Sequence, residues 1–355
     1  MQGFTGRSAN STIVSSALRL AVDARDLATD TRGIGRYTRA IVRRLVRRDD
    51  VELTLLVRGP LPFLKSKALA ATAGSDRFRV SSRASGCDVV WHPANGMFFE
   101  ERLPNVVTIH DAVPFRFPDP DPQRREHQQK PFVRSIRNAA RVIAVSRFGR
   151  DEVADVFGFP AERIDVIYHG VEPVFSPGCA ATKTPYFLFV GDPYSERRKN
   201  FPLLYDAYCD AFHGRGPALA MVGPTDPQKH GVRYEGLAAG DAQGSGDERL
   251  RDLYRGAIAL CVPSFYETFG MPMIEAMACG TPVLASDASC LPEIGGQAAL
   301  YAPPHDRTAW SRILQSVAEE PQLRERLREA GIARARAFDW DESARLHVEA
   351  FNSVR

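Results

Sequence analysis

The sequence predicts an α/β protein with two doubly wound parallel sheets, one in each of two consecutive domains. Short apolar runs alternate along the chain with segments of helical periodicity, which is typical of strand-helix-strand units around a buried parallel sheet. The series stops at residues 172–185, a stretch rich in Pro, Ser, Thr, Gly and Ala, and then starts again. The length of 355 residues suits two domains of roughly 150 residues each.

Eleven apolar runs mark the expected strands. In the first domain they are residues 18–23, 52–57, 87–91, 106–110, 141–146 and 164–168. In the second domain they are residues 186–191, 218–223, 257–263, 282–286 and 298–301. We therefore expect Rossmann-like domains at residues 1–175 and 176–340, and a C-terminal helix, residues 341–355, that packs back toward the first domain. Because ligands of such sheets bind beyond the carboxyl ends of the strands, we expect the site in a cleft between the domains.

Composition narrows the class of protein. The longest apolar stretch, residues 257–263, is far shorter than the roughly 18 residues of a membrane span, and residues 1–17 lack the apolar core of a secretory signal. We therefore expect a cytoplasmic protein. The six cysteines show neither CxxC nor Cys/His spacing, so we expect buried free thiols, no disulfide and no zinc.

Basic residues are concentrated in the first half, where residues 1–178 carry 27 Lys and Arg against 20 Asp and Glu. Two basic rows have helical spacing: Arg36, Arg39, Arg43 and Arg47, and Lys130, Arg134, Arg137 and Arg141. Such a row is ordinarily a solvated helix face. Together the rows suggest a patch for an anionic membrane surface or a lipid-diphosphate acceptor, with the protein peripheral on the inner face of the cytoplasmic membrane. Nucleic acid is not expected as a partner, because the rows lack interleaved aromatic residues.

A glycine pair follows the first expected strand and opens a helix. Gly33 and Gly35 let the backbone approach a leaving phosphate or an acceptor without a Cβ clash. The pair is not a dinucleotide fingerprint, because Thr38 replaces the third glycine and the second strand ends at Arg58 and Gly59 without an acidic ribose ligand. This pattern argues against a dehydrogenase.

The segment PSFYETFGMPMIEAMACG carries the clearest site signal. Gly270 allows a tight turn, Pro272 suits the first turn of a helix, and Gly280 ends that helix. The free N–H groups and the dipole at the helix N-terminus favour a diphosphate. Glu267 and Glu275 lie on either side of the turn, and carboxylates accept hydrogen bonds from the vicinal hydroxyls of a ribose or hexose. The alternative is a dipole-stabilised helix glutamate and a solvated loop glutamate.

A basic loop, DPYSERRKN, follows the strand that ends at residue 191. Lys199, with Arg197 or Arg198, can reach a diphosphate held at that helix N-terminus. The alternative for each arginine is a solvated loop tip.

Two histidines end expected strands of the first domain. His110 and Asp111 close one strand, and His92 closes the strand before it. A lone histidine at a strand end is often structural, but the carboxyl edge of the sheet favours a role at the cleft. Asp111 would then position His110, and His92 is an acceptor-side candidate.

The pair Glu267 and Glu275, separated by TFGMPMI and followed by AMACGTPVLAS, resembles the E-x7-E signature of retaining glycosyltransferase family four, which has the GT-B fold. The resemblance runs from about Arg19 to Trp340 and is closest to the bacterial mannosyltransferase-like branch. It is carried further by RGIGRYTRAIVRRL, VVTIHDAVPFRFP, RVIAVSRFGRDEVADVFGFPAERIDVIYHGVEPVF and CLPEIGGQAALYAPP.

The resemblance implies transfer of a hexose from a nucleotide-sugar donor, with retention and therefore an α-linkage. The branch implies mannose from GDP-mannose, moved to a glycan or lipid-linked saccharide in the synthesis of cell-surface polysaccharide such as lipopolysaccharide. The nucleotide sugar is a substrate, and no metal or other cofactor is expected. Two alternatives stay open: the same mechanism with a UDP-sugar donor, and a non-catalytic scaffold subunit that binds a sugar nucleotide.

Matching positions would take the family's roles. The catalytic set is His110 near the reacting centre, Glu267 on the sugar hydroxyls, and Lys199 and Arg198 on the diphosphate. The donor-binding set is Glu275 on the ribose, Gly270 and Met271 through backbone N–H groups, and Phe269, Gly191, Arg197 and Gly35. The acceptor side is Gly33, Arg36, His92 and Asp111.

Two positions depart from the family's pattern. Asp192 follows Gly191 in a loop that is longer than usual, which leaves open whether Arg197 or Arg198 assists the phosphate lysine. Thr268 stands where the family mostly has glycine, and its side chain beside the sugar would alter the preference for a donor.

Overall fold

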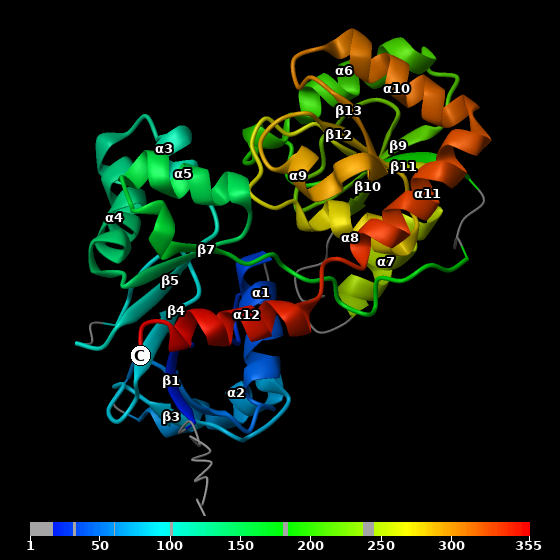
Figure 1. Cartoon of the computed structure of the whole chain (residues 1–355). Helices are drawn as coiled ribbons and strands as arrows, with labels where there is room; N and C mark the ends of the chain where they lie inside the picture. The colour runs from blue at the N-terminus through cyan, green and yellow to red at the C-terminus, as the bar shows by residue number, and fades with distance from the viewer. Residues whose placement is uncertain (1–16, 31–32, 60, 100–101, 180–183, 237–244) are drawn as a thin grey trace, which may run out of the picture.

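The computed structural model describes residues 17–30, 33–59, 61–99, 102–179, 184–236 and 245–355. It contains two parallel sheets, each inside its own layered α/β unit (Figure 1). The fold class that the sequence predicts is confirmed.

The first sheet has seven strands in the order β3-β2-β1-β4-β5-β6-β7, all parallel. They are β1 (Leu18–Asp23), β2 (Val51–Leu56), β3 (Arg79–Ser81), β4 (Val89–His92), β5 (Asn105–Ile109), β6 (Arg141–Ala144) and β7 (Ile164–Val166). Six of these strands coincide with expected apolar runs. The sequence did not predict β3, because this short edge strand is partly exposed and has no buried apolar run.

The second sheet has six parallel strands in the order β10-β9-β8-β11-β12-β13. They are β8 (Tyr186–Val190), β9 (Ala218–Gly223), β10 (Val232–Gly236), β11 (Ala259–Val262), β12 (Val283–Ser286) and β13 (Ala299–Ala302). The edge strand β10 was also missed, since each of its residues is only half-buried and two carry charges. In both sheets the order reverses beside the first strand, at β1/β4 and at β8/β11, and such switch points open crevices at the carboxyl ends.

Helices cover both faces of each sheet. Those of the first unit are α1 (Gly33–Leu45), α2 (Ser66–Ala73), α3 (Val113–Arg116), α4 (Pro122–Asn138) and α5 (Arg147–Phe157). Those of the second unit are α6 (Phe201–Phe212), α7 (Ser245–Gly256), α8 (Met271–Cys279), α9 (Leu291–Gly295), α10 (Arg307–Glu319) and α11 (Pro321–Ala335). The last helix, α12 (Trp340–Asn352), follows them.

The two faces of the first sheet pack against different helices. On β5, Val106 belongs to the apolar cluster that contains α1 and α12, whereas Val107 belongs to the cluster of α4 and α5. Alternate side chains of a strand point to opposite faces, so α1 and α4 lie on opposite sides of this sheet. The second sheet is covered by α6 and α10 on one face and by α7 and α8 on the other.

The end of the chain returns to the first unit. The α12 ribbon lies beside α1 (Figure 1, red beside blue). Trp340, Val348 and Phe351 are buried in the same apolar cluster as α1. The chain is not helical between α11 and α12, where Phe338 is buried in the core of the second unit.

All six cysteines are free; four are buried, Cys209 is half-buried and Cys179 is exposed. The expectation of buried thiols is therefore wrong for Cys179, which lies in the irregular stretch between the sheets. Among the described residues, no helix has the length and apolar character needed to cross a membrane.

Candidate active site

The turn before α8 borders the candidate site. Gly270 has φ of 83°, in the left-handed region that glycine tolerates, and Pro272 occupies the first turn of the helix. Gly280 ends α8 with φ of 79°. A small cavity at this turn is lined by Lys199, Glu267 and both residues of the turn, among others. The N-terminus of α8 therefore faces a charged recess at the β8/β11 switch point.

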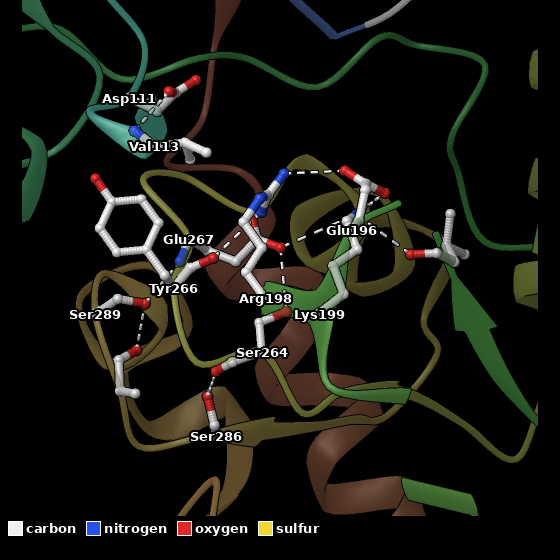
Figure 2. Close-up of polar contacts among 12 residues, drawn as sticks. Asp111, Val113, Glu196, Arg198, Lys199, Ser264, Tyr266, Glu267, Ser286 and Ser289 are labelled. Atoms are coloured by element: carbon white, nitrogen blue, oxygen red, sulfur yellow. Dashed lines mark hydrogen bonds and ion pairs between the residues drawn. The ribbon is translucent and has the colours of Figure 1, made fainter. Parts of the chain in front are cut away.

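Glu267 is the centre of the charged recess. Its Oε1 accepts a hydrogen bond of 3.1 Å from Ser264 Oγ, and its Oε2 lies 3.1 Å from Arg198 Nη1 (Figure 2). Lys199 Nζ lies 4.0 Å from Oε1. Burial raises the pKa of this carboxyl, but Lys199 and Arg198 outweigh it and leave the pKa below its ordinary value. Glu267 is thus an ionised acceptor in the recess.

Lys199 reaches the recess from the other side of the switch point. Its Nζ lies 3.6 Å from Glu196 Oε2 and 3.4 Å from the carbonyl oxygen of Val190 at the end of β8. Gly191 makes this path possible, because a Cβ there would lie 2.5 Å from Lys199 Cδ. The ammonium group therefore lies between two carboxylates, one on each side.

The two arginines of the basic loop are placed differently. Arg198 Nη2 lies 3.0 Å from Glu196 Oε1, and Nη1 donates to the carbonyl of Tyr266 at 3.2 Å. Burial lowers the pKa of Arg198, but Glu267 and Glu196 together raise it above its ordinary value. Arg197 is exposed. Arg198, and not Arg197, therefore faces the recess beside the lysine.

Glu275 occupies a second, separate pocket on α8. Its side chain is 3% exposed, its Oε2 accepts a 3.1 Å hydrogen bond from Tyr254, and its Oε1 lies 2.9 Å from Arg36 Nη2. Burial raises the pKa of Glu275, and the Arg36 charge offsets only part of this effect. The reading of Glu275 as a merely dipole-stabilised helix residue is therefore wrong.

Arg36 is not part of a solvated stripe. It crosses from α1 to the second unit, where its Nη2 also lies 3.4 Å from Asp247. Burial opposes its charge, but Glu275 and Asp247 outweigh that effect and raise the pKa of the guanidinium. Arg36 thus joins the two units through Glu275.

His110 lies directly after β5 and is buried. Its Nε2 lies 2.7 Å from the carbonyl oxygen of Pro93, which can only accept, so Nε2 carries the proton. Its backbone N–H donates to Asn95 Oδ1 at 2.5 Å, and the rings of Tyr37 and His169 pack against it at 4.7 and 5.7 Å. Burial lowers the pKa of His110, which keeps the imidazole neutral at pH 7.

The loop of Glu267 also touches the strand end that carries His110. Ala112 N–H donates to the Tyr266 hydroxyl at 3.2 Å, and that hydroxyl donates to Glu152 at 3.0 Å. Asp111 accepts a hydrogen bond of 3.0 Å from Val113 N–H and lies on the Tyr266 side of Arg198 (Figure 2). Sequence reasoning missed Tyr266, because a single tyrosine in a loop carries no periodic signal.

The loop makes one further contact with the first unit. The carbonyl oxygen of Thr268 accepts a 2.6 Å hydrogen bond from Ser146, which caps α5. The residues on both sides of Glu267 are therefore held across the units, Tyr266 by its side chain and Thr268 by its backbone.

Two expected site residues are core residues instead. His92 is fully buried, with Nε2 3.0 Å from Asn105 Oδ1 and Nδ1 3.9 Å from Asp23, so it offers no surface to an acceptor. Phe269 is buried against His169, at 4.5 Å between ring centroids, inside the apolar cluster of the second unit. Its side chain lies in that core and does not line the cavity at the α8 turn.

The remaining glycine and methionine candidates shape the junction of the units. A Cβ on Gly35 would lie 1.9 Å from the Asp30 carbonyl, so the start of α1 requires glycine there. Gly33 has open space around it. Met271 is partly buried and packs against the apolar clusters of both units. Gly35 therefore shapes the start of α1, and its donor-binding role stays a prediction.

The two basic rows do not form one patch. The α1 row and the α4 row lie on opposite faces of the first sheet, as shown above. Arg141 is not helical but begins β6, where it pairs with Asp165 at 2.5 Å. Arg36 is half-buried and is paired with Glu275 of the second unit. The combined membrane patch predicted from these rows is therefore wrong.

Within the described ranges, no group of three or more His, Cys, Asp or Glu side chains is placed to hold a metal ion. What the recess offers is cationic and hydrogen-bonding chemistry. The two cations Lys199 and Arg198, the carboxylates of Glu196 and Glu267 and the N–H groups of α8 lie together at the switch point. This set suits a ligand in which an anionic group is linked to a polyhydroxylated one.

Comparison with known proteins follows the same division of the chain. Residues 31–175 match the family model "Glycosyltransferase Family 4", and residues 180–334 match "Glycosyl transferases group 1". The chain is 28% identical to O-antigen chain mannosyltransferase B of Escherichia coli, over 90% of this chain and 95% of the relative.

Solved structures share the arrangement of the two units. Sucrose-phosphate synthase from Thermosynechococcus elongatus has a TM-score of 0.70 at 21% identity, covering 95% of this chain and 98% of that one. HepE of Anabaena, in complex with UDP and glucose, has a TM-score of 0.67 at 16% identity, covering 95% and 100%. Since the two family models together span both units, the chain belongs to glycosyltransferase family four and has the GT-B fold.

Proposed function

We propose that this glycosyltransferase transfers mannose from GDP-mannose, with retention, to a glycan or lipid-linked saccharide of a cell-surface polysaccharide. The observation that carries the proposal is the recess in which Lys199 and Arg198 lie beside Glu267 at the N-terminus of α8. The likeness to the Escherichia coli mannosyltransferase supports the choice of sugar.

The leaving group determines what the cations do. As the bond between the sugar and the phosphate breaks, negative charge grows on the diphosphate and positive charge on the sugar ring. Lys199, Arg198 and the α8 N–H groups meet the first charge. Glu196 and Glu267 hold the two cations in place before the donor binds, so Lys199 and Arg198 need little rearrangement.

The two glutamates take different parts of the donor. Glu267, kept ionised by its cations, accepts from hydroxyls of the sugar. Glu275 accepts from the ribose hydroxyls, which then replace Arg36 as its partners. His110, neutral and protonated on Nε2, packs at the strand end that faces the sugar. The acceptor hydroxyl attacks on the face that the phosphate leaves, and its proton passes to the departing phosphate.

A thermal-stabilisation panel tests the proposal, because a ligand that binds only the folded state raises its Tm. The purified chain is heated with GDP, GDP-mannose, UDP, UDP-glucose, UDP-N-acetylglucosamine or NAD. The proposal expects a shift with GDP and GDP-mannose alone, followed by release of GDP on addition of an acceptor. NAD is the negative control.

The same panel separates two alternatives. A UDP-sugar donor is the second candidate, and it is supported by the resemblance in fold to the Anabaena protein solved with UDP and glucose. A shift with UDP ligands alone would keep the mechanism and change the donor. Binding of a sugar nucleotide without its turnover would favour the non-catalytic scaffold subunit, and no shift with any nucleotide would contradict the proposal.

A further inference from the structure

We propose that residues 61–67, LPFLKSK, form a docking turn that inserts apolar side chains into an anionic lipid surface. The docking turn comprises the 3₁₀ helix η1 (Pro62–Lys65) and the start of α2. Leu61, Phe63 and Leu64 are 52%, 61% and 69% exposed. Among the described residues only five large apolar side chains are exposed, and these are three of them. Solvated apolar side chains grouped this closely mark an interaction surface.

Charge selects the occupant of this surface. Lys65 and Lys67 are exposed beside the three apolar side chains. The sequence has no acidic residue between Glu52 and Asp76. Apolar side chains next to cations fit an acyl layer beneath anionic headgroups. The apolar side chains partition into the acyl layer, while the lysine ammonium groups remain at the headgroups.

The docking turn is held outward by the fold. Leu69 and Ala73, on the following turns of α2, are buried in the apolar cluster that contains α1. Helix α2 ends at Gly74, whose φ of 69° is left-handed. The exposed side chains thus lie at the end of a helix fixed to the core, so little conformational entropy is lost when they enter a membrane.

The position of the docking turn relates it to the acceptor. The turn follows the carboxyl end of β2, and β2, β1, β4 and β5 are neighbouring parallel strands. It therefore lies beyond the same sheet edge as His110, three strand spacings or roughly 14 Å across the sheet. Docking would bring this edge to the membrane. Only this purpose, access to a lipid-linked acceptor, rests on the proposed function.

Vesicle flotation of the full chain, with no donor present, tests the inference. We expect the wild type to float with vesicles of phosphatidylcholine and phosphatidylglycerol, and weakly with phosphatidylcholine alone. The variant L61S/F63S/L64S should lose binding by roughly 10² or more. The variant K65Q/K67Q should lose roughly fivefold for each lysine and should lose its sensitivity to salt.

The matched control is K130Q/R137Q, which removes two exposed charges from α4 on the first unit. It should float like the wild type. An unchanged Tm would show that L61S/F63S/L64S still folds, which is expected because its three side chains are in solvent. Wild-type binding that persists in this variant, or no wild-type binding at all, would overturn the inference. So would a wild-type dimer that becomes monomeric in the variant, since a second copy would then cover the turn. None of these results depends on the donor.

Discussion

At the scale of single residues, the half-buried Glu267 and the buried Glu275 lie close together in the sequence and have opposite shifts in pKa. Glu267 faces two cations, Lys199 and Arg198, and its pKa is lowered. Glu275 faces the single cation Arg36 and the neutral Tyr254, and its pKa is raised. Burial raises the pKa of both carboxyls. Two cations outweigh it at Glu267, whereas one cation does not at Glu275, where the charge of Asp247 adds to the effect of burial.

The first prediction concerns the lysine in the recess. Lys199→Ala should reduce turnover by ~10² or more, because a cation that meets the leaving diphosphate is lost. The measurement is kcat with saturating donor. Arg197→Ala is the matched control, since this neighbouring cation is exposed, and it should retain most activity. Equal turnover in Lys199→Ala and wild type would remove the lysine from the site.

The second prediction concerns the glutamate on α8. Glu275→Ala should weaken nucleotide binding by ~1 to 3 kcal/mol, since ribose hydroxyls lose their acceptor. Titration calorimetry with the nucleotide measures the effect. Tyr254→Phe, which removes one donor to Glu275 but keeps the carboxylate, should bind the nucleotide much more tightly than Glu275→Ala. An affinity for Glu275→Ala equal to that of wild type would refute the ribose role.

At the scale of elements, the loops at the carboxyl ends of β8 and β11 build the recess together. These strands are neighbours in the second sheet although helices and two further strands separate them along the chain. The loop after β8 supplies the cations, and the loop after β11 supplies the carboxylate and leads into α8. The glycine at the start of the first loop makes their contact possible.

The third prediction tests that glycine. Gly191→Ala would place a Cβ 2.5 Å from Lys199 Cδ, so the lysine must leave its path and turnover should fall about tenfold or more. Gly214→Ala is the matched control. It also has a positive φ, 77°, but no atom lies within 4 Å of its added Cβ. The control should lose about 1 kcal/mol of stability and little activity, and equal turnover in both variants would contradict the mechanism.

At the scale of the whole molecule, α12 completes a buried chain of hydrogen bonds in the first unit. The Trp91 indole donates to Thr108 at 3.0 Å, and Thr108 lies 3.0 Å from the Tyr37 hydroxyl. Tyr37 lies 2.5 Å from His347 Nε2, and His347 Nδ1 lies 2.7 Å from the carbonyl of Ser343. A carbonyl can only accept, so Nδ1 carries the proton and Nε2 accepts from Tyr37. This arrangement requires a neutral His347.

The fourth prediction is an acid limit to stability. Burial lowers the pKa of His347 to about 4 from 6.5. A depressed folded-state pKa means that the stabilisation is fully present above about pH 6.5 and is lost as the pH falls toward 4. The loss corresponds to about 3 kcal/mol for this group. Urea unfolding at a series of pH values measures it.

The control for this prediction is His347→Gln, which does not titrate in this range. The variant should be less stable at pH 7 and should lose less stability between pH 6.5 and pH 4 than the wild type. Some pH dependence should remain, because burial also lowers the pKa of His110 and of His169. An unchanged pH dependence in the variant would show that His347 does not set the acid limit.

The sequence by itself determined the features that depend on neighbouring residues. The apolar runs predicted the buried strands, because a central parallel strand is apolar on both faces. Gly270, Pro272 and Gly280 predicted the turn, the start and the end of α8, because backbone conformation is a local property. The edge strands β3 and β10 escaped prediction because an exposed edge carries no such run.

Only the tertiary structure decided which side chains meet. It selected Arg198 over Arg197, paired Arg36 with Glu275, and added Glu196 and Tyr266 to the site. It also removed His92 from the cleft and separated the two basic rows onto opposite faces. The physical reason is that contacts and burial depend on how strands far apart in the chain come together at one sheet edge. Periodicity along the sequence indicates which face of a helix or strand a residue occupies, but not which residue it contacts.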